Sequence, residues 1–102
     1  MNRIDINNSN LKIIGIDSGG GEIYYYNNQP YTGIIVNYYK DGNIMKETTC
    51  YNGYPEGLYR FYHKNGTLAE ECYYKNNKLY GLYKEWDENG NLLSEVDCGL
   101  EP

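Results

Sequence analysis

The chain has few of the residues that carry enzyme chemistry and no stretch suited to a membrane. Its 102 residues include one histidine, three cysteines, one phenylalanine and one tryptophan. No apolar run approaches the length of about 18 residues that suggests a membrane-spanning helix. The first residues, Met1 to Asp5, lack the apolar stretch of a signal peptide. We therefore expect a cytoplasmic protein that does not associate with membranes.

The cysteines are too few and too widely spaced for a metal or redox site. Cys50, Cys72 and Cys98 contain no Cys-x-x-Cys pair, and the chain has only one histidine, so the close ligand spacing that is typical of a zinc site is missing. An odd number also leaves at least one thiol unpaired within the chain. We expect three reduced cysteines that occupy strand positions, and neither a metal nor a cofactor.

Tyrosine supplies most of the aromatic surface, with 14 residues. Its ring buries a large apolar area while the hydroxyl group can remain in contact with water or accept a partner. This composition is typical of a sheet whose faces are partly hydrated.

Glycine pairs recur along the chain at an interval of 24 residues, without insertion or deletion. Such a period indicates a stacked repeat array, whose terminal unit is usually atypical. We predict one domain over residues 1–102, with an N-terminal segment, a degenerate capping repeat and three full or truncated repeats. These units are 1–8, 9–32, 33–56, 57–80 and 81–102, and the glycine pairs are Gly33 and Gly42, Gly57 and Gly66, and Gly81 and Gly90.

Each repeat contains two turn signals and no helical periodicity. Asp41-Gly42, Asn65-Gly66 and Asn89-Gly90 lie between apolar-containing segments, which is a strong short-range signal for a β-hairpin. A second polar turn follows, at Asn27-Asn28, Asn52-Gly53 and Asn76-Asn77. The prediction is an all-β fold, an antiparallel meander of tandem 24-residue hairpins that forms an elongated, twisted sheet.

The pairing register decides which side chains share a face. A left-handed glycine in each first turn would pair Tyr38 with Ile44 and Ile34 with Thr48, and would keep the glutamates of the repeats off the apolar face. One face is then predicted to collect Ile34, Leu58, Leu82, Tyr38, Tyr62, Trp86, Ile44, Leu68, Leu92, Cys72 and Val96. The other face would carry tyrosines and carboxylates.

The succession of glycine, an aromatic pair, Asn-Gly or Asp-Gly, an aliphatic residue, glutamate, tyrosine and asparagine resembles the MORN repeat over residues 22–98. It is most similar to the bacterial variant of that repeat, which is known as the antitoxin component of toxin–antitoxin systems. The resemblance implies a repeat scaffold of hairpins and, for the variant, an antitoxin that binds a protein.

Three features invite a catalytic interpretation, and each has a structural one. His63 lies beside a turn, at the repeat position that Tyr39 and Asp87 occupy in the neighbouring repeats. The glutamates at one repeat position, Glu47, Glu71 and Glu95, would lie about 10 Å apart, which is too far to share a metal ion. Gly19-Gly20-Gly21 lacks the lysine and the helix of a phosphate-binding loop. We expect no enzyme, and we expect a cross-strand lysine or a turn of its own repeat as the partner of each glutamate.

The net charge of −5 lies entirely in the last repeat. Residues 1–80 carry eight acidic and eight basic side chains, whereas residues 81–102 carry six acidic side chains and one basic. Such a field repels nucleic acid and anionic lipid and steers a basic protein toward that end. The alternative is that the acidic end only keeps the sheet soluble and prevents edge-to-edge pairing.

The leading hypothesis is a non-catalytic protein-binding module, an antitoxin or immunity protein that neutralises a basic toxin domain. The alternative is a MORN-type scaffold for membrane-associated or other protein assemblies. Binding to lipid would favour lysines along one face, whereas the lysines of this chain are scattered and are balanced by acidic residues. Tyrosines and carboxylates predicted to share one face should bind the partner, namely Tyr59, Tyr73, Tyr83, Glu85, Asp87, Glu95 and Asp97.

Overall fold

The computed structural model describes residues 2–16 and 21–102, and these residues form ten strands and no helix. Among them, therefore, no helix could cross a membrane. The strands are β1 (Arg3–Asp5), β2 (Leu11–Ile16), β3 (Glu22–Tyr26), β4 (Gln29–Pro30), β5 (Gly33–Tyr38), β6 (Ile44–Tyr51), β7 (Tyr54–Tyr62), β8 (Leu68–Lys75), β9 (Lys78–Trp86) and β10 (Leu92–Asp97). The predicted all-β class is confirmed. The Gly19-Gly20 part of the glycine run lies outside the described residues.

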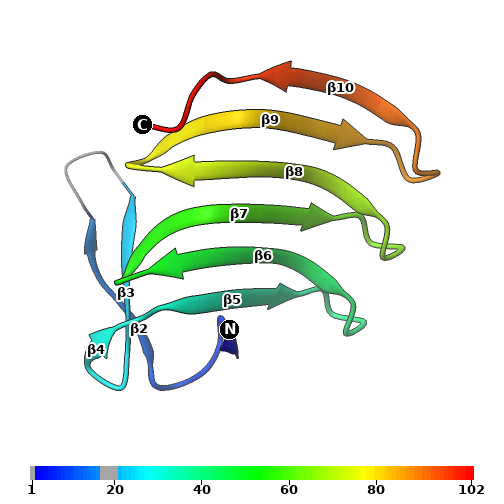
Figure 1. Ribbon diagram of the computed structural model, residues 1–102. Coiled ribbons are helices and arrows are strands. Elements are labelled where there is room, and N and C mark those ends of the chain that lie inside the picture. The colour runs from blue at the N-terminus through cyan, green and yellow to red at the C-terminus, as the bar shows by residue number, and fades with distance from the viewer. Residues whose placement is uncertain (1, 17–20) are drawn as a thin grey trace.

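Three hairpins stack side by side to form most of the larger sheet (Figure 1). This seven-stranded sheet has the order β1-β5-β6-β7-β8-β9-β10, and β5 to β10 pair antiparallel in chain order. The exception is β1, which pairs parallel to β5 at the N-terminal edge. The hairpins β5–β6, β7–β8 and β9–β10 correspond to the three predicted repeats.

The turns have the backbone conformations that their residues favour. Gly42, Gly66 and Gly90 have φ values of 95°, 92° and 86°, which confirms the left-handed position assumed for the first turn. At the other end of the strands, in the turn between β8 and β9, Asn76 and Asn77 have φ values of 53° and 62°. Two successive positive φ values define the two-residue hairpin turn that suits the twist of the strands, and asparagine tolerates them.

Side chains in the first turns join each repeat to the next. The Asn43 amide Nδ2 donates to the Lys64 carbonyl oxygen at 3.0 Å, and Asn65 Nδ2 donates to the Glu88 carbonyl oxygen at 3.0 Å. Just after β5, the Tyr39 hydroxyl donates to the Tyr62 carbonyl oxygen at 2.6 Å. The acceptors Lys64 and Glu88 occupy equivalent repeat positions, so these bonds join each hairpin to the next.

The predicted register holds beside the turn and then fails. Tyr38 pairs with Ile44, as predicted, but Asn37 pairs with Lys46, so that Met45 has no opposite residue. Ile34 is therefore paired with Thr49 and not with Thr48. An extra residue of this kind is a β-bulge, and Ala69 and Leu93 occupy the same position in the next two hairpins.

The bulge changes the composition of the two faces. Because side chains alternate along a strand, one extra residue moves every later side chain to the other face. Cys72 and Val96 therefore leave the predicted apolar face, and the three glutamates join it, so this part of the prediction is wrong. We call this side the row face; it carries Ile34, Leu58 and Leu82 together with Glu47, Glu71 and Glu95.

The glutamates are accommodated on the row face because each has a basic neighbour. Glu47 Oε2 lies 2.6 Å from Arg3 Nη2, and Glu71 Oε2 lies 2.9 Å from Arg60 Nε. Glu95 Oε1 lies 3.7 Å from Lys84 Nζ. Glu47 is also opposite Arg60, and Glu71 is opposite Lys84. Signs thus alternate across the sheet. The predicted cross-strand lysine of the same repeat is present for Glu95, whereas Glu71 pairs with an arginine of its repeat and Glu47 pairs with Arg3, which lies outside its repeat.

The opposite side, which we call the cap face, carries the second sheet. This sheet has the order β2-β3-β4 and lies at one end of the larger sheet (Figure 1). The buried residues Tyr31, Ile35 and Cys50 form the core beneath it, and partly buried apolar residues pack around them: Ile4, Ile6, Leu11, Tyr24 and Tyr26. Residues 9–32 were predicted as a capping repeat at the N-terminal edge of the stacked hairpins. The structure corrects this position, because β1 occupies that edge and β2, β3 and β4 lie over the cap face.

Acid should weaken the Glu47 interaction. Burial acts to raise the pKa of Glu47, but the hydrogen bond from the Tyr62 hydroxyl and the contact with Arg3 outweigh it, so the pKa is lowered from 4.5. A lowered native pKa gives stability that is complete above the unfolded pKa and is lost as pH falls through the native one. In urea unfolding at pH 6 and pH 3, we expect Glu47→Gln to lose less stability between the two than the wild type. An equal loss would contradict this assignment.

Candidate functional site

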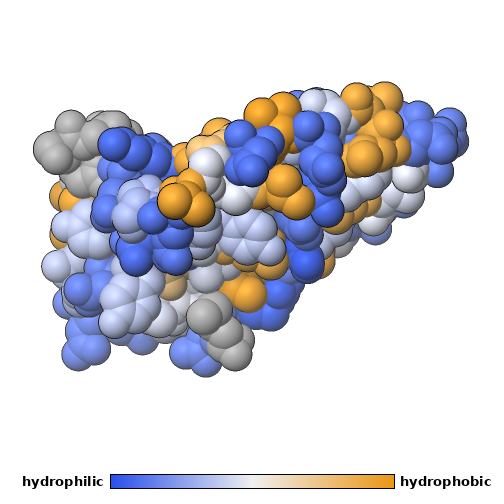
Figure 2. Space-filling view, turned by 45° about the horizontal axis from the view of Figure 1, so that its top comes forward, coloured by the Kyte–Doolittle hydropathy of each residue, from blue (hydrophilic) through white to orange (hydrophobic). Residues whose placement is uncertain are grey.

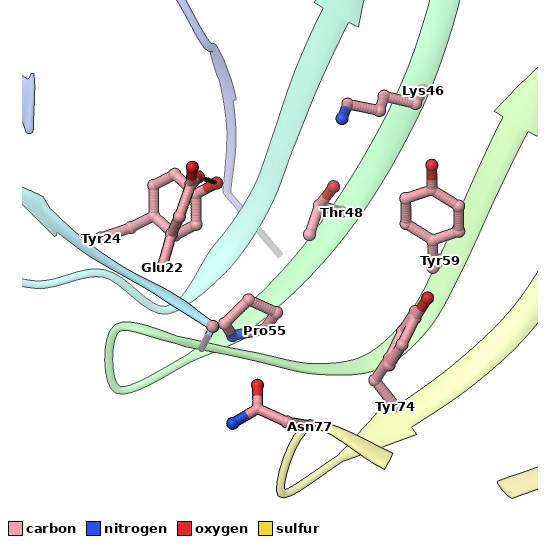
Figure 3. Close-up of a pocket in the computed structure, with 9 residues that line it drawn as sticks. Glu22, Tyr24, Lys46, Thr48, Pro55, Tyr59, Tyr74 and Asn77 are labelled. Atoms are coloured by element: carbon pink, nitrogen blue, oxygen red, sulfur yellow. Dashed lines mark hydrogen bonds between the residues drawn. The ribbon is translucent and has the colours of Figure 1, made fainter. Parts of the chain in front are cut away.

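A cleft opens on the cap face where the smaller sheet ends. It has a volume of about 400 Å³. Figure 3 shows side chains of β6, β7 and β8 on one side and those of β3 on the other. The lining residues are Gly21, Glu22, Tyr24, Lys46, Thr48, Pro55, Tyr59, Tyr74 and Asn77.

Tyrosines dominate the chemistry of this cleft. The Tyr24 hydroxyl donates to Glu22, and the rings of Tyr59 and Tyr74 meet edge to face at 5.9 Å. Burial, together with the nearby Glu70 carboxylate, raises the pKa of Tyr59 to about 12. Its hydroxyl is therefore a neutral hydrogen-bonding group at physiological pH.

Two cysteine thiols near the sheet interior are held in their protonated form. Burial raises the pKa of Cys50 to about 12 and that of Cys72 to about 11, so both free thiols stay protonated. His63 lies outside the cleft, with Nε2 2.8 Å from the Trp86 carbonyl oxygen. This contact is equivalent to the one between Tyr39 and Tyr62, so His63 joins two repeats. In the described part of the chain, no three potential metal ligands come together.

Farther along the cap face, two carboxylates oppose each other. Glu70 of β8 is paired with Glu85 of β9, and the Tyr83 hydroxyl donates to Glu70. Neither carboxylate takes part in an ion pair with a described residue. Like charges directly opposite each other destabilise a sheet, in contrast to the alternating row on the other face. We call Glu70, Glu85, Tyr59, Tyr74 and Tyr83 the acidic tyrosine patch.

A comparison with protein families identifies the repeat. The model of the MORN repeat variant matches residues 31–52, 55–76 and 79–97, more than half of the chain, and each match contains one hairpin of the larger sheet. The chain belongs to the MORN repeat variant family. Its three MORN units indicate a repeat scaffold or binding module. No curated protein and no solved structure gives a significant match.

The residues predicted to bind a partner do not share one face of the MORN sheet. Tyr59, Tyr83 and Glu85 lie on the cap face. Tyr73 follows the bulge at Ala69, and Glu95 and Asp97 follow the bulge at Leu93. These three side chains therefore lie on the row face. Asp87 lies in the last turn, where Oδ1 accepts hydrogen bonds from the backbone N–H groups of Asn89 and Asn91, both at 2.9 Å. The predicted single surface is therefore wrong, whereas binding by these residues stays a prediction.

Sequence reasoning missed Glu70 and Tyr74. Glu70 could have been found from its repeat position. Lys46, Glu70 and Ser94 occupy this position and differ in charge, whereas the next position is a glutamate in all three repeats. A position that varies from one MORN unit to the next is free of the stacking constraint. Tyr74 could be assigned to the cap face only after the bulge was located.

Proposed function

We propose that this MORN protein is a non-catalytic module that binds a basic protein through the acidic tyrosine patch. The observation that carries the proposal is the opposition of Glu70 and Glu85 without an ion-pair partner among the described residues. A lysine or arginine of a bound protein would supply the missing positive charge. Binding would then remove a repulsion that the free protein tolerates.

The surroundings of the two carboxylates suit a protein interface. Tyr59, Tyr74 and Tyr83 are each partly buried, so their rings lose little conformational freedom on binding. Tyrosine is enriched in interfaces, and an aromatic ring beside a carboxylate can also stabilise a cation above its face. Among the described residues, the smaller sheet lies at one end of the larger sheet (Figure 1), and all five side chains of the acidic tyrosine patch stay partly exposed.

We further propose that the basic partner is a toxin domain and that this chain is its antitoxin or immunity protein. The net charge of −5 in residues 81–102 supports a basic partner, as toxins that degrade nucleic acid tend to be basic. The protonated thiols and the structural contact of His63 support inhibition by binding and not by catalysis. A cytoplasmic location remains a prediction.

Charge reversal in the patch should weaken partner binding. The partner would first be captured from native cell extract by cross-linking and identified by mass spectrometry. Glu70→Lys with Glu85→Lys should then slow its association at least about tenfold, because steering and local neutralisation are both lost. Tyr83→Ala should mainly speed dissociation. Surface plasmon resonance at several salt concentrations would separate the two effects, and co-expression with the partner would test neutralisation.

The matched control changes the net charge equally at other positions. Glu56→Lys with Glu88→Lys also raises the net charge by four but leaves the acidic tyrosine patch unchanged, so it should slow association much less. Equal slowing by both double variants would assign the effect to overall charge and contradict the patch. A captured partner that is not toxic when expressed alone would contradict the antitoxin role.

A further inference from the structure

β10 gives the larger sheet an outer edge with exposed apolar side chains. β10 is the last strand of the larger sheet, and no described strand pairs with its outer side (Figure 1). Two of its side chains occupy repeat positions that are buried one unit earlier. Leu93 is 64% exposed where Ala69 is 7% exposed, and Val96 is 50% exposed where Cys72 is 2% exposed.

These exposed side chains match what a further strand would cover. In β8, the equivalent positions are buried between β7 and β9, whereas β10 has a neighbour on one side only. Figure 2, with the β10 side of the sheet turned toward the viewer, shows apolar side chains exposed among hydrophilic ones. An edge strand with exposed apolar residues and unpaired backbone groups is a template for strand addition.

The alternating charges on the row face indicate which type of residue an added strand should carry at one position. Glu47 has Arg60 opposite it on the next hairpin, and Glu71 has Lys84. Glu95 continues this row, but its only paired neighbour is Lys84 of its own hairpin. A strand that paired with β10 as β7 pairs with β6 would place a side chain directly opposite Glu95. A lysine or arginine at that position would continue the alternation of sign.

The same charges disfavour a second copy of this chain as the occupant. Two β10 strands paired antiparallel in a register centred on Glu95 would place Glu95 opposite Glu95, and a register centred on Val96 would place Glu95 opposite Asp97. Each copy also adds the net charge of −5 of its last repeat. Like charges at directly opposed positions are destabilising, so a basic partner fits this edge better.

We propose that the outer edge of β10 accepts an antiparallel β-strand of a basic partner protein, with a lysine or arginine opposite Glu95. This inference rests on the proposed function, since it names the part of a basic protein that would bind. The backbone hydrogen bonds of the added strand supply affinity, and the residue opposite Glu95 supplies selectivity.

A peptide taken from the chain itself is a suitable probe. Residues 54–62, Tyr-Pro-Glu-Gly-Leu-Tyr-Arg-Phe-Tyr, pair antiparallel with β6 and place Arg60 opposite Glu47. This peptide, with two added lysines for solubility, would be titrated into the full-length protein while amide hydrogen exchange is followed by NMR. We expect exchange of alternate amides in residues 92–97 to slow about tenfold at saturation. The peptide with Arg60→Glu should have little effect.

A charge swap tests the register. The Glu95→Arg protein should reverse the preference, so that the Arg60→Glu peptide protects β10 and the original peptide does not. Unchanged exchange in β10 at the highest soluble peptide concentration, or equal protection by both peptides, would overturn the proposal. A stable dimer that Val96→Lys dissociates, seen by sedimentation, would also overturn it in favour of a second copy.

The two proposals can fail separately. Slowed exchange confined to the strands around Glu70 and Glu85 would refute strand addition and leave the acidic tyrosine patch as the binding surface. Protection of β10 without any effect of Glu70→Lys and Glu85→Lys on partner binding would refute the patch and leave the edge.

Discussion

Replacing Gly33 with alanine is expected to destabilise the protein by about 2–4 kcal/mol, because two independent costs coincide. Gly33 has a φ of 151°, a value that other residues rarely adopt. An added Cβ would lie 2.4 Å from the Tyr31 hydroxyl oxygen and 2.7 Å from the Asn2 carbonyl oxygen. The Tyr31 ring cannot move freely, since it is 4% exposed and belongs to the core. Urea unfolding of both proteins would measure the difference.

Two other glycines separate the steric cost from the backbone cost. Gly66 has a φ of 92° but open space around it, so Gly66→Ala should cost only about 1 kcal/mol. A bulkier Gly66→Val should cost at least as much, because β-branched residues tolerate this conformation poorly. Gly15 has neither a crowded Cβ position nor a positive φ, and Gly15→Ala should change stability by no more than about 0.5 kcal/mol. Similar losses at Gly33 and Gly66 would show that the contact with Tyr31 is relieved at little cost.

Ile35→Ala should cost about 2–5 kcal/mol, the range for a large apolar side chain removed from a packed core. Ile35 is 1% exposed and lies with Tyr31 and Cys50 between the two sheets. The variant would lose apolar burial and leave a cavity that the strands on either side cannot close. Thermal or urea unfolding, followed by far-ultraviolet circular dichroism, would measure this loss.

The control for Ile35 is an exposed isoleucine of β2. Ile13 is 53% exposed, so Ile13→Ala should cost less than about 1 kcal/mol. A comparable loss in both variants would mean that the smaller sheet is stabilised as a unit rather than through the core at Ile35. A small loss at Ile35 would show that the smaller sheet does not pack stably on the cap face.

The repeat and its turns could be predicted because their causes are local. Gly42, Gly66 and Gly90 adopt left-handed conformations that other residues resist, and Asn76 and Asn77 tolerate the opposite turn. The interval of 24 residues then fixes the order of the hairpins. Tyr38 pairs with Ile44 as expected, since this contact is the first one beyond the turn.

The faces could not be predicted in full because a single unpaired residue reverses them. Met45 has no distinctive chemistry, yet its bulge places Glu47 on the face of Ile34 and Leu58. An argument from burial alone placed the glutamates elsewhere, since it did not count the compensation by Arg3, Arg60 and Lys84. The bulges also place Glu70 and Tyr74 on the face of Tyr59, and move Tyr73 and Glu95 to the other face.

The sequence by itself determined the all-β class, the three hairpins, both sets of turns and the acidic end, because each depends on backbone preference or on charge along the chain. The tertiary structure decided the bulges, the position of residues 9–32 over the cap face, and the opposition of Glu70 and Glu85. These features depend on contacts between strands that are distant in sequence. Cross-strand packing and charge compensation select among registers that local preferences leave nearly equal in energy.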